Sequence, residues 1–387
     1  MENILLTGGG TLGPVVPLLA VGQKLCGQGD DIQLYWLGTY KGPERKLISK
    51  YNIEYQPIAS AKMRRYVSLY WLIDPFRFMK GIVQAWYYLR KWQVDIVLTA
   101  GGYVSVPVAM IAKLMKIPVL VHQQDVLPGI ANKMMSGFAS KITVALEENK
   151  KAFGGAETEV VGNPVRQEIA KIKEQSEELN NKLFEKYDLR RDLPILFVLG
   201  GGTGSDQINE LIWGSLDELT KICQIIHITG KNKKISLPKK VNTDTMDSLV
   251  PETRSFAALF GRDNSNYHPF EFLDNTAEVY TVSDIVIARA GFSTLTELSH
   301  LGKPAIIIPI SHSHQVANAK YFKDNEAIEM VEYSEKILGD EVKDFVGRVK
   351  SLIKNKDRQI ELGKNIHKAL MTDTGSKLAE VVREMLR

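Results

Sequence analysis

Residues 284–309 contain the side chains and the spacing best suited to bind an anion. A short apolar run rich in β-branched residues ends in the turn Ala290-Gly291, and a helix with several hydroxyl groups is predicted to follow. The first amides of a helix lack intrahelical partners and form the positive end of its dipole, so this junction suits a diphosphate. Glu297 lies about one turn inside the helix, where its carboxylate could accept hydrogen bonds from a sugar diol. An ordinary helix cap would give the same pattern.

Three further glycine-containing loops follow predicted strands. They span residues 8–13, 100–102 and 200–204. A strand, a glycine loop and a helix form the opening unit of a doubly wound sheet, so we expect an α/β protein. The first loop does not have the spacing G-x-G-x-x-G, and no acidic residue ends the next predicted strand. An NAD site is therefore not favoured.

The bulk composition limits the possible protein classes. With 387 residues, 44% hydrophobic and 24% charged, the chain predicts a globular protein of two domains. A net charge of +4 is too small to favour nucleic acid as a partner. Cys26 and Cys223 lack metal-site spacing and are expected to be reduced and buried in a cytosolic protein. No stretch approaches 18 uninterrupted apolar residues, so membrane contact is expected to be peripheral.

Residues 62–92 differ in composition from the rest of the chain. They contain nine aromatic and seven basic residues, and Asp74 is their only acid. Phe76, Met79, Val83 and Trp86 fall on one helical face, which predicts that this face packs in the core. The remaining mixture of aromatic and basic side chains suits the surface of an anionic membrane. The alternative is an aromatic core with a solvated basic face.

Five stretches, in order, resemble motifs of the MurG family, the membrane-associated glycosyltransferases that make lipid II. They are residues 9–11, 101–105, 161–166, 201–204 and 289–302, and the resemblance covers at least residues 3–325. It implies inverting transfer of N-acetylglucosamine from UDP-N-acetylglucosamine to lipid I (undecaprenyl-diphospho-MurNAc-pentapeptide), without a metal or another cofactor. It also implies a peripheral enzyme at the cytoplasmic face of the cell membrane.

The resemblance further implies a GT-B fold, in which two Rossmann-like domains face a cleft. We place the acceptor- and membrane-facing domain at residues 1–162 and the UDP-sugar-binding domain at 163–373, with a last helix, about 374–387, packing back on the first domain. By the family pattern, Leu273 recognises uracil, Glu297 holds the ribose, Thr203 and the amides after Gly291 hold the diphosphate, and Gln315 reads the sugar. The full implied substrate-binding set is Thr11, Leu12, Gly13, Asp125, Arg166, Thr203, Leu273, Phe292, Ser293, Thr294, Leu295, Thr296, Glu297 and Gln315.

The chain departs from the family pattern mainly on the acceptor side. A family histidine in the first loop is Pro14 here, which offers neither a base nor an N–H group. The family's His-Glu-Gln-Asn is His122-Gln123-Gln124-Asp125, so one carboxylate is lost and another is gained. Asp125 is therefore the candidate catalytic base, and His122 is a weaker candidate. A helix-capping Asp125 near Pro128 and a buried His122 at a strand end are the structural alternatives.

Three interpretations follow from these departures. The enzyme could act on lipid I with Asp125 as its base, or transfer to another lipid-linked acceptor, or bind a UDP-sugar without catalysis. UDP-sugar 2-epimerases share the expected fold but would not need a membrane acceptor. A polar stretch at residues 232–266 is expected to be an insertion or a mobile loop.

Overall fold

The protein forms two compact units in a computed structural model. The structure describes residues 1–27, 31–61, 74–154, 157–174, 177–202, 204–231, 233, 266–371 and 374–387. The first unit comprises Met1–Ala170 with Leu370–Arg387, and the second comprises Lys171–Ala369. The sequence predicts a boundary after residue 162, whereas in the structure α6 (Gln167–Ala170) belongs to the first unit. The reason is that Ile169 is fully buried and α6 contacts α1 (Val15–Cys26).

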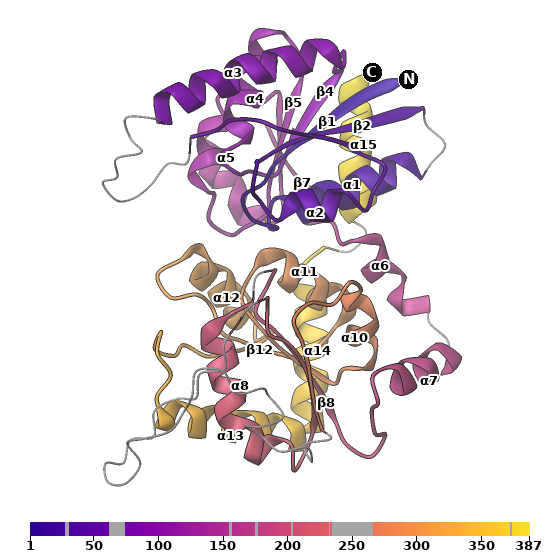
Figure 1. The fold of residues 1–387 in the computed structure, drawn as a ribbon, viewed down its shortest axis with the longest axis vertical. Coiled ribbons are helices and arrows are strands. Elements are labelled where there is room, and N and C mark those ends of the chain that lie inside the picture. The colour runs from indigo at the N-terminus through magenta and orange to yellow at the C-terminus, as the bar shows by residue number, and fades with distance from the viewer. Residues whose placement is uncertain are drawn as a thin grey trace. The chain divides into compact units, whose positions relative to one another are not determined.

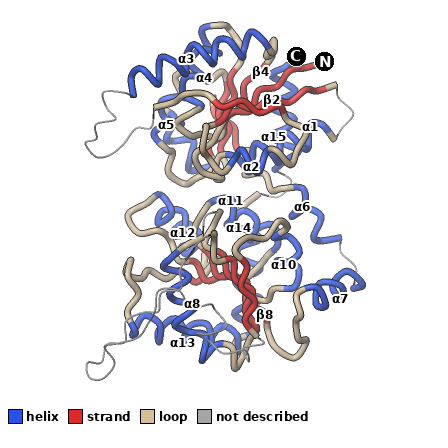
Figure 2. The backbone as a smooth tube through the Cα atoms, viewed as in Figure 1, coloured by secondary structure: helices blue, strands red, loops and turns tan. Residues whose placement is uncertain are grey.

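A parallel sheet forms the centre of the first unit (Figure 2). From β1 (Glu2–Thr7) the following strands are added on one side of the sheet, and from β4 (Ile96–Thr99) they are added on the other side. The boundary between β1 and β4 is therefore the topological switch point of the sheet. Helices cover both faces, so the inner strands of the sheet are mostly apolar and buried, whereas its two edge strands are polar and partly exposed. The strand order is β3 (Glu54–Pro57), β2 (Ile32–Gly38), β1 (Glu2–Thr7), β4 (Ile96–Thr99), β5 (Val119–Gln123), β6 (Lys141–Val144) and β7 (Thr158–Val160).

Two groups of helices cover this sheet. One core joins it to α1 and to α15 (Thr374–Leu386), which lie side by side although they come from opposite ends of the chain (Figure 1). Leu378, Val381 and Val382 of α15 are buried in that core. The other core holds side chains of α3 (Asp74–Lys91), α4 (Ser105–Leu114) and α5 (Ile130–Met135). The short segments of this unit are α2 (Glu44–Ile48), α6 and the 3-10 helix η2 (Glu147–Phe153).

The second unit repeats the same plan. In its parallel sheet the order of the strands reverses between β8 (Ile195–Leu199) and β11 (Ile285–Ala288), as it does between β1 and β4 in the first sheet. The order is β10 (Tyr267–Phe270), β9 (Gln224–Ile228), β8 (Ile195–Leu199), β11 (Ile285–Ala288), β12 (Ala305–Ile307) and β13 (Glu329–Met330). The helical segments are η3 (Lys171–Glu174), α7 (Glu177–Lys186), α8 (Asp206–Leu219), α10 (Thr276–Val282), α11 (Phe292–Leu301), α12 (His314–Asp324), α13 (Gly339–Lys354) and α14 (Lys356–Ala369). The predicted α/β class with two doubly wound domains is confirmed.

The predicted core face of α3 is wrong. Phe76, Met79, Val83 and Trp86 are 76%, 58%, 60% and 46% exposed. The helix instead buries the opposite face, which is formed by Gly81, Ala85 and Leu89. A side chain at Gly81 would collide with the carbonyl of Ala59, so the small residues allow the helix to approach the unit closely. The large apolar side chains are consequently left on the outer face.

Some predictions fall outside the described residues. These are Thr203, residues 62–73 of the aromatic segment and all of the 232–266 stretch except Lys233 and Asn266. Cys223 is buried as predicted, but Cys26 at the end of α1 is exposed, because the helix turns that position away from the sheet. Among the helices that the structure describes, none is long and apolar enough to cross a membrane.

Candidate functional site

The strand ends at the switch point of the second unit bring two predicted ligand-binding segments together. Ala288 of β11 pairs with Leu199 of β8, so the loops that follow these strands leave the sheet side by side. One loop begins the glycine-rich stretch at residues 200–204, and the other leads to α11. Gly291 precedes α11 in an extended conformation and provides no side-chain cap. The first amides of α11 therefore face the edge where ligands bind in such sheets.

Arg289 ties these strand ends together. Its Nη2 donates to Ser205 Oγ at 2.6 Å, and its Nη1 donates to Gln207 Oε1 at 2.6 Å. Nη1 also donates to the carbonyls of Ile308 and Pro309 after β12, each at 3.1 Å. Burial lowers the pKa of Arg289 to about 10, so the guanidinium stays charged at neutral pH. The second unit thus holds a positive charge beneath its glycine loop.

Helix α11 contains six of the predicted donor contacts, in two different environments. Phe292 and Leu295 are buried in the unit, so they can reach a ligand only through backbone atoms. Ser293 and Thr294 are partly exposed in the first turn. The remaining two are Thr296, whose hydroxyl donates to the carbonyl of Phe292 at 2.8 Å, and Glu297.

Glu297 is the acidic member of this set, and its side chain is only 6% exposed. A carboxylate accepts hydrogen bonds and cannot donate them, so it matches a pair of hydroxyl groups. Its burial means that such bonds would form with little competition from water. The arrangement is suited to a ribose diol.

Two more predicted contacts lie on the same edge of the second sheet. Gln315 is in the first turn of α12, where its Oε1 accepts from the amide of Ile310 at 3.2 Å. Buried Asn318 of α12 donates to the carbonyl of Ala290 at 3.2 Å, which ties α12 to the start of α11. Leu273 follows β10 at the far side of the sheet and is half-buried. Gln315 thus lies on a helix that contacts the start of α11, whereas Leu273 follows the outermost strand, β10.

The first glycine loop of the other unit packs against two neighbouring loops. A side chain at Gly10, where φ is +85°, would contact the ring of Tyr103. A Cβ built on Gly13 would lie 3.4 Å from Gln124 Nε2. The predicted contacts Thr11, Leu12 and Gly13 are therefore close to the loop that holds Asp125. The carbonyl of Leu12 accepts from the amides of Val15 and Val16, each at 3.1 Å.

His122 is held on both sides of its ring. Nδ1 lies 3.0 Å from Thr143 Oγ1, and Nε2 lies 3.1 Å from Asn163 Oδ1. The side chain is 1% exposed, and burial lowers its pKa to about 4, so the ring is neutral at physiological pH. Thr374 of α15 donates to the carbonyl of Asn163 at 2.7 Å. These contacts favour the interpretation of His122 as a buried strand-end residue.

Gln123 fixes the backbone that carries Asp125. Its Nε2 donates to the carbonyl of Asp125 at 2.6 Å, and its Oε1 accepts from Asn132 Nδ2 at 2.6 Å. Asn149 Nδ2 also donates to the carbonyl of Asp125, at 3.2 Å. A carboxylate in place of Gln123 could not donate to that carbonyl. The amide at position 123 and the half-buried carboxylate at position 125 therefore belong to one local arrangement.

Arg166 belongs to the first unit rather than to the second, where the sequence places it. Burial raises the pKa of the Tyr51 phenol and Glu168 raises it further, whereas the nearby charge of Arg166 acts to lower it. Arg166 and the donor-side residues of α11 therefore belong to different units.

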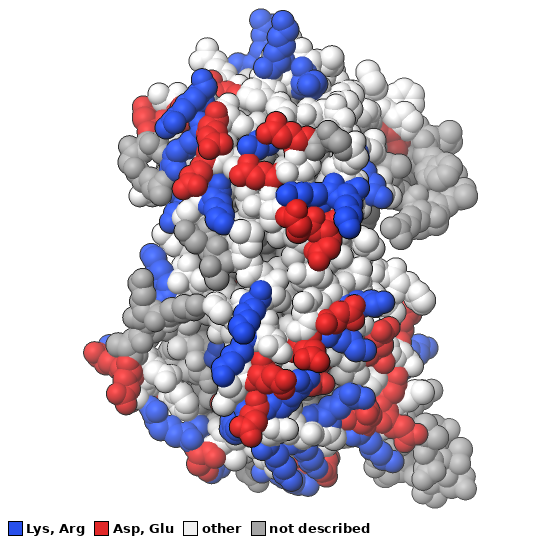
Figure 3. All heavy atoms as spheres, turned by 180° about the vertical axis from the view of Figure 1, so that it is seen from behind, with Lys and Arg blue, Asp and Glu red and all other residues white. Residues whose placement is uncertain are grey.

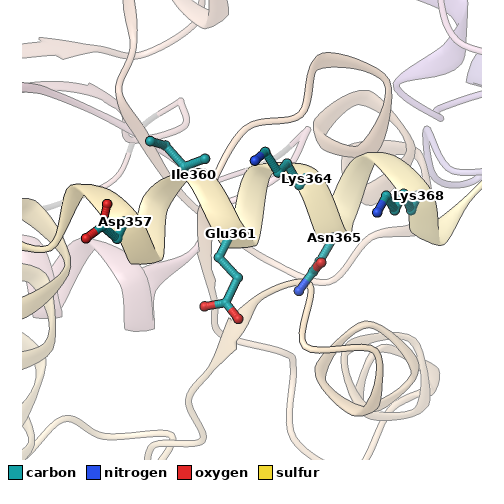
Figure 4. A pocket seen from close by; sticks show the side chains of 6 residues that line it. All are labelled: Asp357, Ile360, Glu361, Lys364, Asn365 and Lys368. Atoms are coloured by element: carbon teal, nitrogen blue, oxygen red, sulfur yellow. The ribbon is translucent and has the colours of Figure 1, made fainter.

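A shallow hollow on α14 does not coincide with these residues. Figure 4 shows that its lining comes from one helix, with no member of the predicted site. The lining residues are Asp357, Ile360, Glu361, Lys364, Asn365 and Lys368.

Comparison with known proteins identifies the family. The glycosyltransferase family 28 N-terminal domain matches residues 4–144, and the family 28 C-terminal domain matches residues 195–374. A UDP-N-acetylglucosamine–N-acetylmuramyl-(pentapeptide) pyrophosphoryl-undecaprenol N-acetylglucosamine transferase from Clostridium botulinum is 32% identical and covers 99% of both chains. The chain belongs to this MurG family of glycosyltransferases. The resemblance inferred from its motifs is confirmed.

Two other comparisons extend this assignment. A Bacillus cereus protein with the same transferase name, numbered 2, is 34% identical to this chain. The match covers 92% of this chain and 93% of that protein. The crystal structure of Acinetobacter baumannii MurG has a TM-score of 0.68 at 22% identity, covering 99% of this chain and 100% of that one. This second likeness shows the fold, and the predicted GT-B class is confirmed.

Sequence reasoning missed several polar residues of this MurG-family chain that are buried or partly buried. Arg289 was part of a motif but was given no role, and Asn132 and Glu44 were not considered. Glu44 is fully buried and accepts a hydrogen bond from the amide of Gly10 at 3.2 Å. An acidic residue between short loops has no periodic pattern from which its burial can be predicted. The only signal in the sequence was its position after the turn-forming pair Gly42-Pro43.

Proposed function

We propose that the protein transfers N-acetylglucosamine from UDP-N-acetylglucosamine to lipid I with inversion, which forms lipid II for peptidoglycan. The proposal rests on the residues that lie at the ends of the central strands of the second unit. There a partly buried guanidinium, Arg289, lies beside the uncapped start of α11 and the buried carboxylate of Glu297. A diphosphate and a ribose diol are the matching chemical groups. The names of the curated relatives support the choice of sugar and acceptor.

In this proposal the second unit holds the donor. The amides of residues 292–296, together with Thr203, bind the diphosphate, and Glu297 binds the ribose hydroxyls. Leu273 and Gln315 contact the uracil and the sugar. Positive potential from Arg289 and from the helix start stabilises the departing UDP, because the charge on its diphosphate grows as the glycosidic bond breaks. Thr11, Leu12, Gly13 and Arg166 of the first unit are further proposed substrate-binding residues.

Asp125 is the proposed base. Inversion in one displacement needs a group that takes the proton from the acceptor hydroxyl as that oxygen attacks the sugar. Pro14 has no base, and both ring nitrogens of His122 are already engaged. The carboxylate of Asp125 is half-buried, and Gln123 and Asn149 fix its backbone.

We also propose that α3 binds the enzyme peripherally to an anionic membrane at the cytoplasmic face, where lipid I is embedded. Its outer face exposes large apolar side chains at the helical spacing that is typical of a helix lying on a bilayer. Basic residues accompany them, and the guanidinium of Arg90 lies 5.5 Å from the ring centre of Trp86. In the view of Figure 3, acidic and basic side chains are interspersed over the described surface. The proposed docking residues are Phe76, Arg77, Met79, Lys80, Val83, Trp86, Tyr87, Arg90 and Lys91.

The test is product formation with defined acceptors. Purified protein is incubated with UDP-N-acetylglucosamine and a lipid I analogue, and the products are identified by mass spectrometry. The proposal expects the acceptor to gain one N-acetylhexosamine. Transfer only to a different lipid-linked acceptor would support the second interpretation. UDP binding without turnover on any acceptor would support a non-catalytic binding protein.

A further inference from the structure

Asn132 on α5 is a buried amide that joins three segments of the first unit, and its side chain is only 4% exposed. Its Nδ2 donates to Gln123 Oε1 at 2.6 Å and to the carbonyl of His122 at 3.3 Å, both at the end of β5. A Cβ built on Gly101 would lie 2.9 Å from its Oδ1, so Asn132 also contacts the second glycine loop. The residue thus fixes α5 and the end of β5 next to that loop.

The hydrogen bonds that lead from Asn132 to Asp125 run in one direction. The carbonyl of Asp125 can only accept, so Gln123 must turn its Nε2 toward it, and this bond measures 2.6 Å. Gln123 then turns its Oε1 toward Asn132, which must present its Nδ2. The hydrogen-bond network thus sets the orientation of both amides. The bond that places Asp125 therefore depends on a donor at position 132.

A second buried amide holds the same loop from another element. Asn149 of η2, which is 1% exposed, donates through Nδ2 to the carbonyl of Asp125 at 3.2 Å and to that of Val126 at 2.7 Å. Gln123 Nε2 also lies 3.4 Å from the carbonyl of Leu127. Three successive carbonyls, those of residues 125, 126 and 127, thus accept from buried side chains. Loops at strand ends are usually mobile, and a loop held in this way is what a preorganised site requires.

The unpartnered oxygen of Asn132 indicates that packing alone does not explain the residue. Oδ1 is buried and has no hydrogen-bond partner among the residues that the structure describes. An unpartnered buried acceptor costs folding free energy, and an apolar side chain of similar size would avoid that cost. What an apolar side chain could not supply is the donor to Gln123.

We propose that Asn132 is a positioning residue for the transfer reaction. Acting through Gln123, it holds the backbone at Asp125 so that the carboxylate of Asp125 stays where it meets the acceptor hydroxyl. The role of Asp125 as the base rests on the proposed function. The attachment of residues 125–127 to α5 follows from the hydrogen bonds alone and is tested separately.

Hydrogen exchange tests this attachment without requiring turnover. Asn132→Leu keeps a side chain of similar size but removes both donated bonds. In the full-length variant the amides of residues 126–136 are therefore expected to exchange at least about fivefold faster than in wild type. Mass spectrometry of the peptides from this region measures the rates, and thermal melting checks that the variant is folded. Unchanged exchange in folded Asn132→Leu would overturn the proposal.

A matched pair of glutamines separates this role from a general effect on folding. Gln123→Glu replaces the donor to the carbonyl of Asp125 with an oxygen, so kcat with the lipid I analogue is expected to fall about tenfold to 100-fold, with the KM for UDP-N-acetylglucosamine within about twofold of wild type. Gln224→Glu is the control, because Gln224 is also fully buried and its Nε2 donates to the carbonyls of Arg190 and Leu193 at 2.8 and 3.2 Å, but in the second unit. Its kcat is expected to stay within about twofold of wild type. Equal losses of kcat in the two variants would contradict a positioning role.

A double-mutant cycle shows whether Asn132 acts through Asp125. Asn132→Leu alone is expected to lower kcat by about tenfold, but when it is added to Asp125→Asn it is expected to change kcat by no more than about twofold. A further tenfold loss in the double variant would show an independent effect of Asn132 and would overturn the proposal. Absence of turnover in wild-type protein would instead refute the proposed function, and the exchange experiment would still decide whether Asn132 holds the loop.

Discussion

Around the switch point of each sheet the two units have the same strand order and the same loop sequence, Gly-Gly-Gly-Thr, but the charged side chains next to the two loops, Glu44 and Arg289, have opposite signs. In the first unit the carboxylate of Glu44 accepts from the loop amide. In the second unit the guanidinium of Arg289 donates to Ser205 at the end of the loop. A glycine loop after a first strand is therefore not a phosphate site by its sequence alone. The two loops differ in the charged side chain that lies next to them.

Both units also contain a buried histidine on a strand next to the centre of the sheet. His227 on β9 lies 3.0 Å from Asn209 and 2.9 Å from Tyr267, as His122 lies between Asn163 and Thr143. Burial lowers the pKa of His227 to about 3. The units therefore resemble each other in their structural histidines and differ in the charges beneath their loops.

The largest expected effect comes from Asp125→Asn in the first unit. The change removes the proposed base and keeps the shape of the side chain, so kcat is expected to fall by about 100-fold to 10,000-fold. The affinity for UDP, measured by calorimetry, is expected to stay within about twofold, because the proposed contacts to the diphosphate and the ribose come from the second unit. A variant with wild-type kcat would remove Asp125 as the base.

The same acid-to-amide change in the second unit should act on the donor instead. Glu297→Gln weakens the proposed bonds to the ribose hydroxyls, so UDP affinity is expected to fall by roughly tenfold to 100-fold. Calorimetric titration with UDP measures this loss. Glu341→Gln is the control, since it alters a carboxylate of the same unit on α13. Unchanged UDP affinity in Glu297→Gln would break the assignment of the donor to this edge of the sheet.

The outer face of α3 provides a test confined to the first unit. Replacing Phe76 and Trp86 with serine is expected to weaken binding to vesicles that contain anionic lipid by about tenfold or more, because two large apolar side chains no longer insert. Co-sedimentation with vesicles measures the change. Turnover with a water-soluble acceptor analogue is expected to be unaffected. Vesicle binding at the wild-type level would place the membrane contact elsewhere.

The last prediction concerns the feature that the units share and is read in folding stability rather than in binding. His122 and His227 have folded pKa values of about 4 and 3, below the usual 6.5, so folding disfavours their protonated forms. Their contribution to stability is complete above about pH 6.5 and is lost as the pH falls toward the folded values. At pH 5 the loss is about 2 kcal/mol for each histidine. Chemical denaturation at pH 7 and pH 5 measures it, and a variant with both histidines replaced by glutamine should lose most of this dependence.

The sequence predicted the architecture well because its signals are local. Apolar runs followed by glycines marked the strand ends of both sheets, and the family motifs fall at those same ends. The helix at residues 74–91 was also foreseeable, but its orientation was not. Both of its faces are apolar, and the choice depended on the close contact between Gly81 and Ala59, which no periodicity reveals.

The site could be predicted only in part for a related reason. Residues 292–297 follow a strand directly, so their position at the sheet edge follows from topology. Glu44 acts through two loops that are distant in sequence, and its burial depends on space left by Gly9 and Gly42. Gln123 had the appearance of a lost carboxylate until its bond to the carbonyl of Asp125 was seen. Such roles depend on tertiary contacts that the chain order does not contain.

The most direct test of the difference between the two units is the affinity for UDP when each buried charge is removed. Arg289→Met takes away the positive charge of the second unit, and Glu44→Gln takes away the negative charge of the first, with thermal melting used to check that both variants are folded. Calorimetry is expected to show UDP binding at least about tenfold weaker in Arg289→Met and within about twofold of wild type in Glu44→Gln. Loss of UDP binding in folded Glu44→Gln, with full binding retained in Arg289→Met, would contradict the account.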